Sequence, residues 1–182
     1  QISLMKNENE KKELENDINE MTAMLNSYVN FVKGETPETI ENINLNNLIT
    51  NICKSNSSPE LKITENFNNK IVTSGRPLQI KRAFQNIIDN SKRYSTEIDI
   101  KITIKEENCL IIISDNGPGI PEKQLEDVFK PFFTLDPSRN KLKGESGLGL
   151  TIARDIIRAH GGDIKLSKSK IGGLETTINL PL

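Results

Sequence analysis

The stretch from Asn86 to Tyr94, which reads NIIDNSKRY, most constrains what this chain can fold into. At about 100° per residue, a helix here places Asn86, Asn90 and Arg93 within roughly 60° of one another. A neighbouring arc of the same helix is apolar and contains Ala83, Phe84, Ile87, Ile88 and Tyr94. The stretch therefore predicts a buried helix that offers two carboxamides and a guanidinium to a polar ligand such as a metal-bound polyphosphate. The alternative is the solvated face of an ordinary amphipathic helix.

The length and charge of the chain limit the classes of protein to which it can belong. Its 182 residues are enough for one α/β domain with a sizeable core and a smaller appendage. The formal net charge is −1, with 24 basic and 25 acidic residues mixed along the sequence. Because this mixture creates no basic field, we expect no nucleic-acid partner. The single histidine rules out a metal site rich in histidine.

Apolar residues recur at spacings of three and four near the start of the chain: Leu14, Ile18, Met21, Leu25, Tyr28 and Val32. This heptad pattern predicts a helix that needs partner helices to cover its apolar seam. We interpret residues 1–34 as the C-terminal part of a helical hairpin, residues 35–42 as a charged linker, and residues 43–182 as the main domain. The alternative is a helix packed against its own domain.

The rest of the chain alternates between strand and helix patterns. Strands are predicted at Leu61–Phe67, Ile71–Thr73, Ile98–Lys105, Cys109–Ser114, Asp163–Lys168 and Glu175–Leu180. Helices are predicted from the capping residue Asn44 to about Ser55, from Pro77 through the Asn86 stretch, from about Glu122, and from Gly149 to His160. This succession predicts one α/β domain.

Asp115 follows a strand that we expect to be buried, and a glycine-rich turn comes directly after it. A buried carboxylate is costly without a partner, and the exocyclic amine of adenine would supply one. Guanine would instead present a carbonyl oxygen to the carboxylate, so the wrong base would be rejected. Gly117 and Gly119 remove side chains where the backbone must approach a flat base. In isolation, the Gly-Pro-Gly sequence is equally typical of an ordinary turn.

Gly147 and Gly149 directly precede a predicted helix, whose free N–H groups and positive dipole end form an anion site suited to phosphates. Neither a Walker loop nor a Rossmann glycine pattern is present. Asn90 would offer a side-chain oxygen to Mg²⁺, a hard ion that takes its other ligands from water and phosphates. Arg93 would counter phosphate charge, and Lys92 is a further candidate for the same task.

A polar segment at residues 135–146 separates the phenylalanine-rich stretch VFKPFF from this anion site and is expected to act as a lid. It carries the basic residues Arg139, Lys141 and Lys143. Phe129, Phe132 and Phe133 are interpreted as core or lid-anchoring residues. The alternative is a contact between these phenylalanines and the helical hairpin.

Taken together, these motifs resemble the Bergerat-type ATP-binding fold and, within it, the sensor histidine kinases of two-component systems, most nearly the osmosensor type. NIIDNSKRY resembles the asparagine box of that family, SDNGPGIP its first glycine box, VFKPFF its phenylalanine box and GESGLGL its second glycine box. The four boxes occur in the family's order, and the resemblance covers nearly all of the chain. It implies a two-layer α+β sandwich preceded by part of a dimerisation hairpin.

The resemblance also implies ATP and Mg²⁺ as cofactors and assigns their binding residues. Asn90 would be the magnesium ligand, Asp115 would hold the adenine amine, and Asn86 is the one catalytic candidate. The full set of implied nucleotide-binding residues is Asn86, Asn90, Arg93, Tyr94, Asp115, Gly117, Gly119, Ser146, Gly147, Leu148, Gly149 and Leu150.

The implied partners are ATP, a phosphoacceptor hairpin of the same or a partner subunit, and the receiver domain of a response regulator. We expect the full-length protein to be a homodimer of the cytoplasmic membrane, with these residues in its cytoplasmic portion. The family's phosphoacceptor histidine, followed by an acidic residue and a proline, has no counterpart here. His160 precedes two glycines at a helix end and is expected to be structural.

Asn86 bears on which reaction takes place. Related ATPases of this fold have a glutamate four residues before the magnesium asparagine, and the carboxamide of Asn86 cannot take a proton from water. This favours phosphoryl transfer to an imidazole, which is nucleophilic without prior deprotonation. Two alternatives stay open: an ATP hydrolase or serine kinase of the same fold, and a non-catalytic interaction module that nucleotide merely stabilises.

Overall fold

The structure is a computed structural model that describes residues 38–55, 62–67, 70–135 and 147–182. It also describes a few positions nearer the start of the chain: Lys11, Lys12, Leu14, Glu15, Ile18, Met21 and Thr22. The predictions for Ser146, for most of the lid and for most of the hairpin fall outside the described residues.

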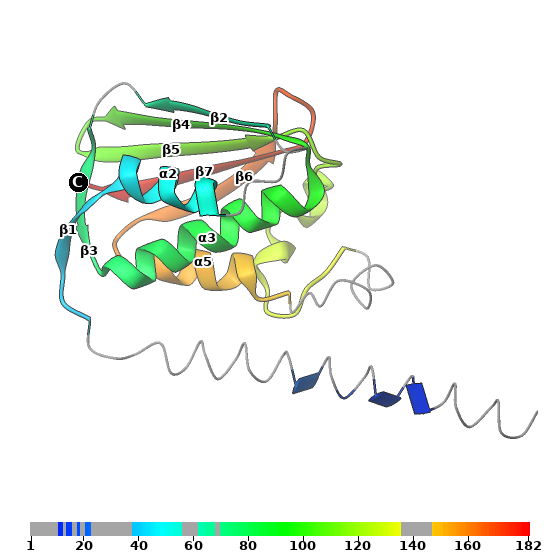
Figure 1. Cartoon of the computed structure of the whole chain (residues 1–182). Coiled ribbons are helices and arrows are strands. Elements are labelled where there is room, and N and C mark those ends of the chain that lie inside the picture. Colours follow the sequence, from blue (N-terminus) through cyan, green and yellow to red (C-terminus); the bar gives the residue numbers. More distant parts are fainter. Residues whose placement is uncertain are drawn as a thin grey trace, which may run out of the picture.

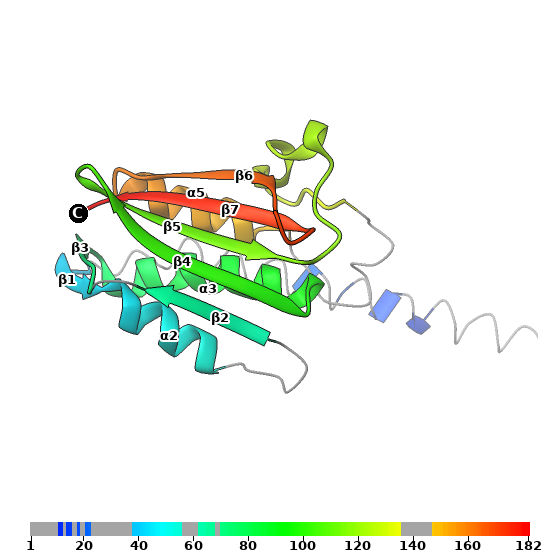
Figure 2. The same ribbon diagram turned by 90° about the horizontal axis from the view of Figure 1, so that it is seen from above.

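Two layers form the main domain, a five-stranded sheet and a set of helices on one of its faces (Figure 1, Figure 2). The strand order is β2-β4-β5-β7-β6, with bounds Lys62–Phe67, Glu97–Lys105, Asn108–Asp115, Leu174–Pro181 and Asp163–Lys168. β2 pairs with β4 in parallel, and the other neighbours are antiparallel. The helices are α2 (Leu45–Ser55), α3 (Pro77–Tyr94) and α5 (Gly149–Ala159). The predicted two-layer α+β sandwich is confirmed.

The core lies between the sheet and these helices. Alternate residues of β4 and β5, such as Ile100 and Ile111, are fully buried against α3 residues such as Phe84 and Ile87. The apolar run of β5 alternates too, because Leu110 and Ile112 point to the other face and are only half-buried. The helices cover one face of the sheet, so a continuous apolar strand need not be buried on both sides.

A strand that the sequence did not predict, β1 (Glu41–Asn44), pairs antiparallel with β3 (Val72–Gly75) in a second, two-stranded sheet. Glu41 and Asn42 lie in the segment assigned to the linker, so ordered structure begins before residue 43. The sequence gives no strand pattern here, because Ile43 is the one buried residue of β1 and a single apolar position shows no alternation. Glu38 is also engaged, since its carboxylate accepts hydrogen bonds from the backbone N–H groups of Leu78 and Gln79.

Element ends mostly agree with the sequence signals. The side chain of Asn44 accepts a hydrogen bond from the Asn47 N–H at 3.1 Å, which caps α2 as predicted. The helix predicted from Glu122 is wrong: the segment forms two short 3₁₀ turns, η1 (Glu122–Gln124) and η2 (Asp127–Phe129). Only Val128 and Phe129 are buried in it, so it has no apolar stripe long enough to hold an α-helix against the core.

The described positions near the start of the chain that belong to the heptad seam are Leu14, Ile18 and Met21. All three are helical and more than half exposed. Within the described residues nothing covers this part of the seam. The assignment of residues 1–34 to a hairpin stays a prediction.

Candidate functional site

α3 runs from one end of the site to the other and presents the two predicted asparagines on its flank. Its buried face consists of Ile80, Ala83, Phe84, Ile87, Ile88 and Ser91. Asn86 and Asn90 are half-buried beside that face, and Arg93 and Tyr94 are exposed at the C-terminal end of the helix. The predicted separation into an apolar face and a polar flank is therefore present in the structure.

α5 packs against α3 so that its first residue faces Asn86. A Cβ atom added to Gly149 would lie 3.9 Å from the Cβ of Asn86. α5 has no side-chain N-cap and no acidic residue in its first turn. Its first intrahelical bond runs from the Ile152 N–H to the Leu148 carbonyl at 2.9 Å, which leaves the N–H groups of residues 149–151 without helical partners. This helix start has the donors that an anion needs.

The side-chain nitrogen Nδ2 of Asn86 is buried and has no hydrogen-bond partner among the described residues. A buried donor left unpaired costs about 1–3 kcal/mol, so it calls for an explanation. The Cβ of Asn86 lies close to Gly149, the first residue of α5, so an anionic ligand at the start of that helix is a partner that the amide could have. The residues present thus fit a phosphate group at this point.

Gly147 joins this helix start to the phenylalanine-rich stretch. Its backbone has a φ of +62°, and an added Cβ would lie 2.8 Å from the carbonyl carbon of Phe132. The Phe132 N–H donates to the Gly147 carbonyl at 3.1 Å. The Thr151 hydroxyl adds a bond to the Phe129 carbonyl at 2.9 Å. The two motifs are therefore held together by backbone contacts.

The three phenylalanines have different environments. Phe129 is 2% exposed and lies under the guanidinium of Arg154, 3.8 Å from the ring centre. Phe133 is half-buried and packs against the core. Phe132 is 52% exposed and has a φ of +63°. The prediction of a core role holds for the first two, whereas Phe132 faces solvent.

At the other end of α3, the Asp115 carboxylate is 4% exposed. Its Oδ1 accepts hydrogen bonds from the N–H of Gly117 at 2.9 Å and of Leu174 at 3.0 Å. Among the described residues both partners contact Oδ1, which leaves Oδ2 for a ligand's amine. A Cβ on Gly117 would lie 2.8 Å from the Tyr94 carbonyl oxygen, so the turn after Asp115 fits closely against the end of α3.

Gly173 and Leu174 are the residues of this end that the sequence did not predict. They lie far along the chain, in the hairpin between β6 and β7, and the Gly173 N–H donates to the Asp115 carbonyl at 3.0 Å. A glycine pair in a hairpin is an ordinary turn signal, and nothing in it points to Asp115. The pairing of β5 with β7 brings them together.

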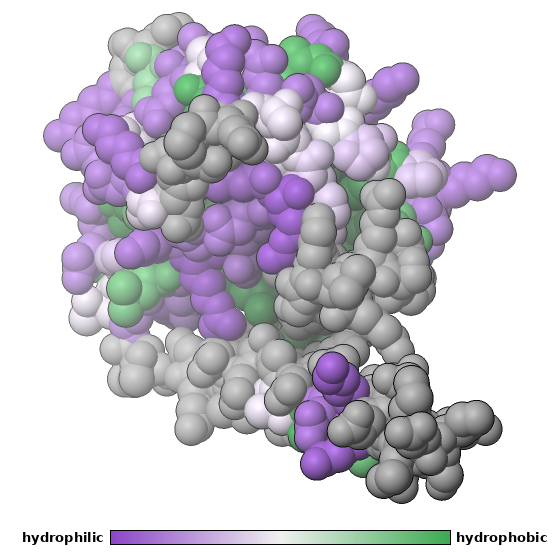
Figure 3. Space-filling view, turned by 45° about the vertical axis from the view of Figure 1, so that its right-hand side comes forward, coloured by the Kyte–Doolittle hydropathy of each residue, from purple (hydrophilic) through white to green (hydrophobic). Residues whose placement is uncertain are grey.

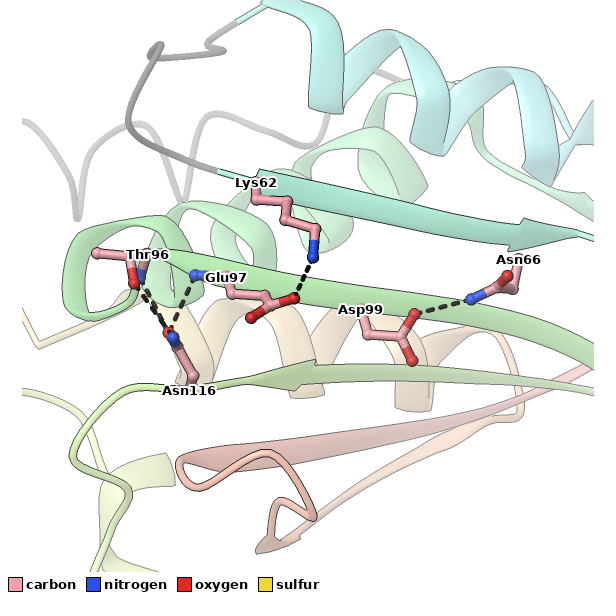
Figure 4. Close-up of polar contacts among 6 residues, drawn as sticks. All are labelled: Lys62, Asn66, Thr96, Glu97, Asp99 and Asn116. Carbon is pink, nitrogen blue, oxygen red and sulfur yellow. Dashed lines mark hydrogen bonds and ion pairs between the residues drawn. The ribbon is translucent and has the colours of Figure 1, made fainter.

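Asn116 is a further residue that the sequence did not single out. Its side-chain oxygen accepts bonds from the N–H groups of Thr96 and Glu97, each at 3.0 Å, and its nitrogen donates to the Thr96 hydroxyl at 3.1 Å (Figure 4). These bonds fix the turn after Asp115 to the start of β4. Figure 4 also shows the Lys62–Glu97 ion pair at 2.8 Å, which links β2 to β4 on the exposed side and belongs to the fold.

Lys92 and His160 have structural contacts. The Lys92 ammonium donates to the Ile52 carbonyl at the end of α2, 3.3 Å away, and its task of countering phosphate charge stays a prediction. The His160 Nε2 accepts a bond from the Arg76 N–H at 3.1 Å, and Nδ1 lies 2.7 Å from the Ile156 carbonyl. Nδ1 therefore carries the proton and donates to that carbonyl. As expected, His160 is structural, and it joins the end of α5 to the start of α3.

Both cysteines are buried. Burial, together with the nearby Glu65 carboxylate, raises the pKa of Cys53 to about 11, and burial raises that of Cys109 to about 12.

The described part of the chain holds no cluster of His, Cys, Asp or Glu that could bind a metal. A metal at this site would depend on the amide oxygen of Asn90 and on phosphate oxygens, which suits Mg²⁺. None of the described helices has the length and apolar character needed to span a bilayer.

Among the described residues visible in Figure 3, hydrophilic ones dominate and hydrophobic ones form small separate patches. A hollow lies elsewhere, on the outer face of the sheet, lined by residues such as Lys105, Asp163 and Lys165. It contains none of the predicted site residues. Those of them that the structure describes lie on α3, at the start of α5 near Asn86, and in the turn after Asp115 near Tyr94.

Comparisons with known proteins agree on one family. A family model described as "Histidine kinase-, DNA gyrase B-, and HSP90-like ATPase" matches residues 75–182, more than half of the chain. The chain is 29% identical over 187 residues to the sensor histidine kinase GtrS of Pseudomonas aeruginosa, which covers 99% of this chain and 37% of that protein. It is 37% identical over 109 residues to the sensor histidine kinase CpxA of Escherichia coli, which covers 59% of this chain and 24% of that protein.

The fold has a counterpart among solved structures. The mycobacterial sensor histidine kinase MprB superposes with a TM-score of 0.67 at 23% sequence identity, covering 79% of this chain and 97% of that one. The chain spans less than two fifths of the length of either GtrS or CpxA.

Proposed function

We propose a function from the premise that this chain belongs to the histidine kinase-, DNA gyrase B- and HSP90-like ATPase family. In our proposal it binds Mg²⁺-ATP and is the catalytic part of a two-component sensor histidine kinase. The γ-phosphate would pass to a histidine on a dimerisation hairpin and from there to an aspartate of a response regulator. The names of the relatives GtrS and CpxA support the kinase assignment.

The single observation that carries the proposal is the buried Asp115 carboxylate, held by two N–H donors on one oxygen and open on the other. An exocyclic amine is the partner that such a carboxylate needs, and adenine has one. Asp115 would therefore bind the adenine, with Gly117, Gly119 and Tyr94 close to the base and ribose.

The phosphates would lie at the other end of α3. Asn86 and Tyr94 are eight residues apart, or roughly 12 Å along the helix, a span comparable with that of an extended nucleoside triphosphate. The N–H groups at the start of α5 and the Asn86 amide would donate to phosphate oxygens, and Arg93 would counter their charge. Ser146, Gly147 and Leu148 would complete the phosphate contacts.

Mg²⁺ would neutralise the charge that develops on the phosphates during transfer. Asn90 would hold it through its amide oxygen, with the remaining ligands coming from water and phosphate. Because this chain would supply one neutral ligand, the metal is expected to arrive with the nucleotide.

Asn86 favours transfer over hydrolysis, because a carboxamide cannot act as a general base toward water. A neutral imidazole nitrogen would attack the γ-phosphorus as the bond to the bridging oxygen breaks and ADP leaves. The protein's task would then be to hold the acceptor in line and balance charge. Phe132, exposed next to the phosphate end, is a candidate contact for the hairpin that carries the acceptor.

Labelled ATP tests this function. The chain is incubated with γ-labelled ATP and Mg²⁺, with and without the upstream hairpin from its own gene, and label is followed on protein and as free phosphate. Acid-labile, base-stable label on the hairpin, lost in Asn90→Ala, is the expected result. Free phosphate without labelled protein would show a hydrolase and overturn the argument from Asn86.

Two further outcomes separate the alternatives. If Mg²⁺-ATP fails to raise the melting temperature, the kinase and the hydrolase are both excluded, because ligand at 100 times its Kd should stabilise the folded state by about 2.7 kcal/mol. The proposed homodimer is tested separately. If the full-length protein is labelled while it is monomeric in solution, that proposal is wrong. Fractionation of cells expressing the full-length protein checks the proposed place in the cytoplasmic membrane.

A further inference from the structure

Three backbone segments meet at the Asp115 carboxylate. β5 ends there, the turn of residues 116–120 follows, and the hairpin of residues 169–173 between β6 and β7 reaches it from the neighbouring strand (Figure 1, Figure 2). Leu174 donates its N–H to Oδ1 at 3.0 Å and Gly173 donates its N–H to the Asp115 carbonyl at 3.0 Å. The hairpin therefore contacts both the side chain and the backbone of Asp115.

This approach requires glycine at position 173. A Cβ there would lie 2.2 Å from the Asp115 Oδ1 and 2.4 Å from the Gly117 nitrogen, distances that no side chain tolerates. Gly173 is buried, and its neighbours are backbone and a carboxylate held by two hydrogen bonds, so none can yield easily. The hairpin can bring its N–H groups to Asp115 only because residue 173 has no side chain.

The hairpin is itself held in place. Ser169 is 4% exposed, and its N–H donates to the Gly173 carbonyl at 2.8 Å. Its hydroxyl accepts a bond from the Ile171 N–H at 3.2 Å. On the other side, a Cβ on Gly119 would lie 3.3 Å from the Gly173 carbonyl oxygen, so the two turns are stacked closely. The position of Gly173 is fixed from both directions.

We infer that Gly173 is a positioning residue that determines base specificity through Asp115, an inference that rests on the proposed adenine site. Two N–H donors on Oδ1 prevent the carboxylate from rotating, so Oδ2 alone faces the base and accepts from its amine. Guanine offers a carbonyl at the same position and is refused. The hairpin thus fixes the orientation of the Asp115 carboxylate, so that Oδ2 accepts from one direction.

The same geometry predicts an inversion of specificity. In Asp115→Asn the side-chain oxygen stays with the N–H groups of Gly117 and Leu174, because an amide nitrogen cannot accept them. The amide NH₂ then takes the place of Oδ2 and faces the base as a donor. This variant should lose affinity for ATP and gain affinity for inosine triphosphate, which has a carbonyl in place of the amine.

The test compares Mg²⁺-ATP with the Mg²⁺ complex of purine riboside triphosphate, which lacks the 6-amino group, by calorimetry on the whole chain. In Gly173→Ala we expect ATP affinity to fall roughly tenfold or more, since a charge-assisted hydrogen bond is lost. Affinity for purine riboside triphosphate should change far less, so the ratio between the two nucleotides collapses. Gly172→Ala is the matched control: it strains the same hairpin at φ +122° but its Cβ meets open space, and the ratio should survive.

Equal weakening of both nucleotides by Gly173→Ala would overturn the inference, because a merely structural role lowers both. If that variant does not fold, Asp115→Asn decides: a gain for inosine triphosphate supports the fixed carboxylate, and no gain overturns it. A wild-type chain that binds ATP no better than purine riboside triphosphate would instead refute the adenine role of Asp115. The two failures are thus distinguishable.

Discussion

The two ends of the site differ in how complete they are. At the Asp115 end, the carboxylate is anchored by Gly117 and Leu174. At the Asn86 end, a buried amide nitrogen has no partner among the described residues, and the N–H groups that open α5 have no helical acceptor. We infer that the Asp115 end, which we assign to the base, has its protein contacts before a ligand binds. The Asn86 end, which we assign to the phosphates, has donors that the ligand would engage.

This difference has a physical reason. A buried carboxylate needs hydrogen-bond donors from the protein before any ligand arrives, and Oδ1 of Asp115 has two, whereas Oδ2 is left for the ligand. N–H donors at a helix start can lack a protein partner before the ligand binds, because water can reach most of them. For the proposed nucleotide site, we therefore expect little change at the Asp115 end on binding and a larger change in the donors at the start of α5.

The largest expected effect comes from removing the preformed end. Asp115→Ala should lower ATP affinity by roughly 10- to 100-fold, because a charge-assisted hydrogen bond contributes about 1.5–3 kcal/mol. It should also lower the free energy of unfolding, because the Gly117 and Leu174 N–H groups lose their acceptor. Calorimetry and urea unfolding measure the two effects, and unchanged ATP affinity would contradict the comparison.

A matched pair of glycines at the phosphate end comes next. Gly147→Ala should lower stability by about 1–2 kcal/mol, because L-residues are strained at positive φ and its Cβ would lie 2.8 Å from Phe132. In Gly149→Ala the new Cβ meets nothing closer than 3.9 Å, so stability should hold or rise slightly. Thermal unfolding of both variants checks the pair, and equal losses would be inconsistent with the described backbone.

Asn86→Leu should separate ligand binding from stability. Removing an unpaired buried donor should raise the free energy of unfolding without ligand by about 1 kcal/mol. The additional stabilisation by Mg²⁺-ATP should shrink, because the phosphates lose a donor. The measurement is the melting temperature with and without Mg²⁺-ATP. A less stable apo protein would mean that the Asn86 amide already has a partner.

The smallest effect concerns a residue outside both ends. Glu38 accepts bonds from the first turn of α3, so Glu38→Ala should lower stability by about 0.5–2 kcal/mol, as for loss of a helix cap. Glu41→Ala, in the same segment, is the control: among the described residues its carboxylate accepts a bond from the exposed Thr39 hydroxyl, and the change should lie within about 0.5 kcal/mol. Neither variant should alter the preference for ATP over purine riboside triphosphate. If Glu38→Ala changed that preference, the linker segment that contains Glu38 would contribute to nucleotide binding.

The sequence predicted the parts of the fold whose signals are local. The amphipathic pattern around Asn86, the glycine stop after His160 and the alternation in β4 each specify one element, and the structure has them. β1 and the 3₁₀ turns after Pro121 were missed because four- and three-residue elements carry too few apolar positions to show a period. β1 forms because it pairs with β3, and the 3₁₀ turns are held by the burial of Val128 and Phe129.

The candidate site shows the same division. Asp115 and Asn90 could be proposed from the sequence because a carboxylate after a buried strand and an amide beside an apolar helix face each call for a polar partner. Gly173 and Leu174 could not, because their task arises from the pairing of β5 with β7, which no local pattern contains. The contact of Lys92 with α2 could not be predicted either, because it depends on how the two helices pack.

Amide hydrogen exchange with and without Mg²⁺-ATP tests the central claim most directly. Without ligand, the amides of Gly117 and Leu174 should already exchange slowly, because both are bonded to Asp115. Mg²⁺-ATP should then slow the amides of residues 149–151 the most. Protection on the outer face of the sheet near Lys105 and Lys165, with no change at the start of α5, would contradict a nucleotide site along α3.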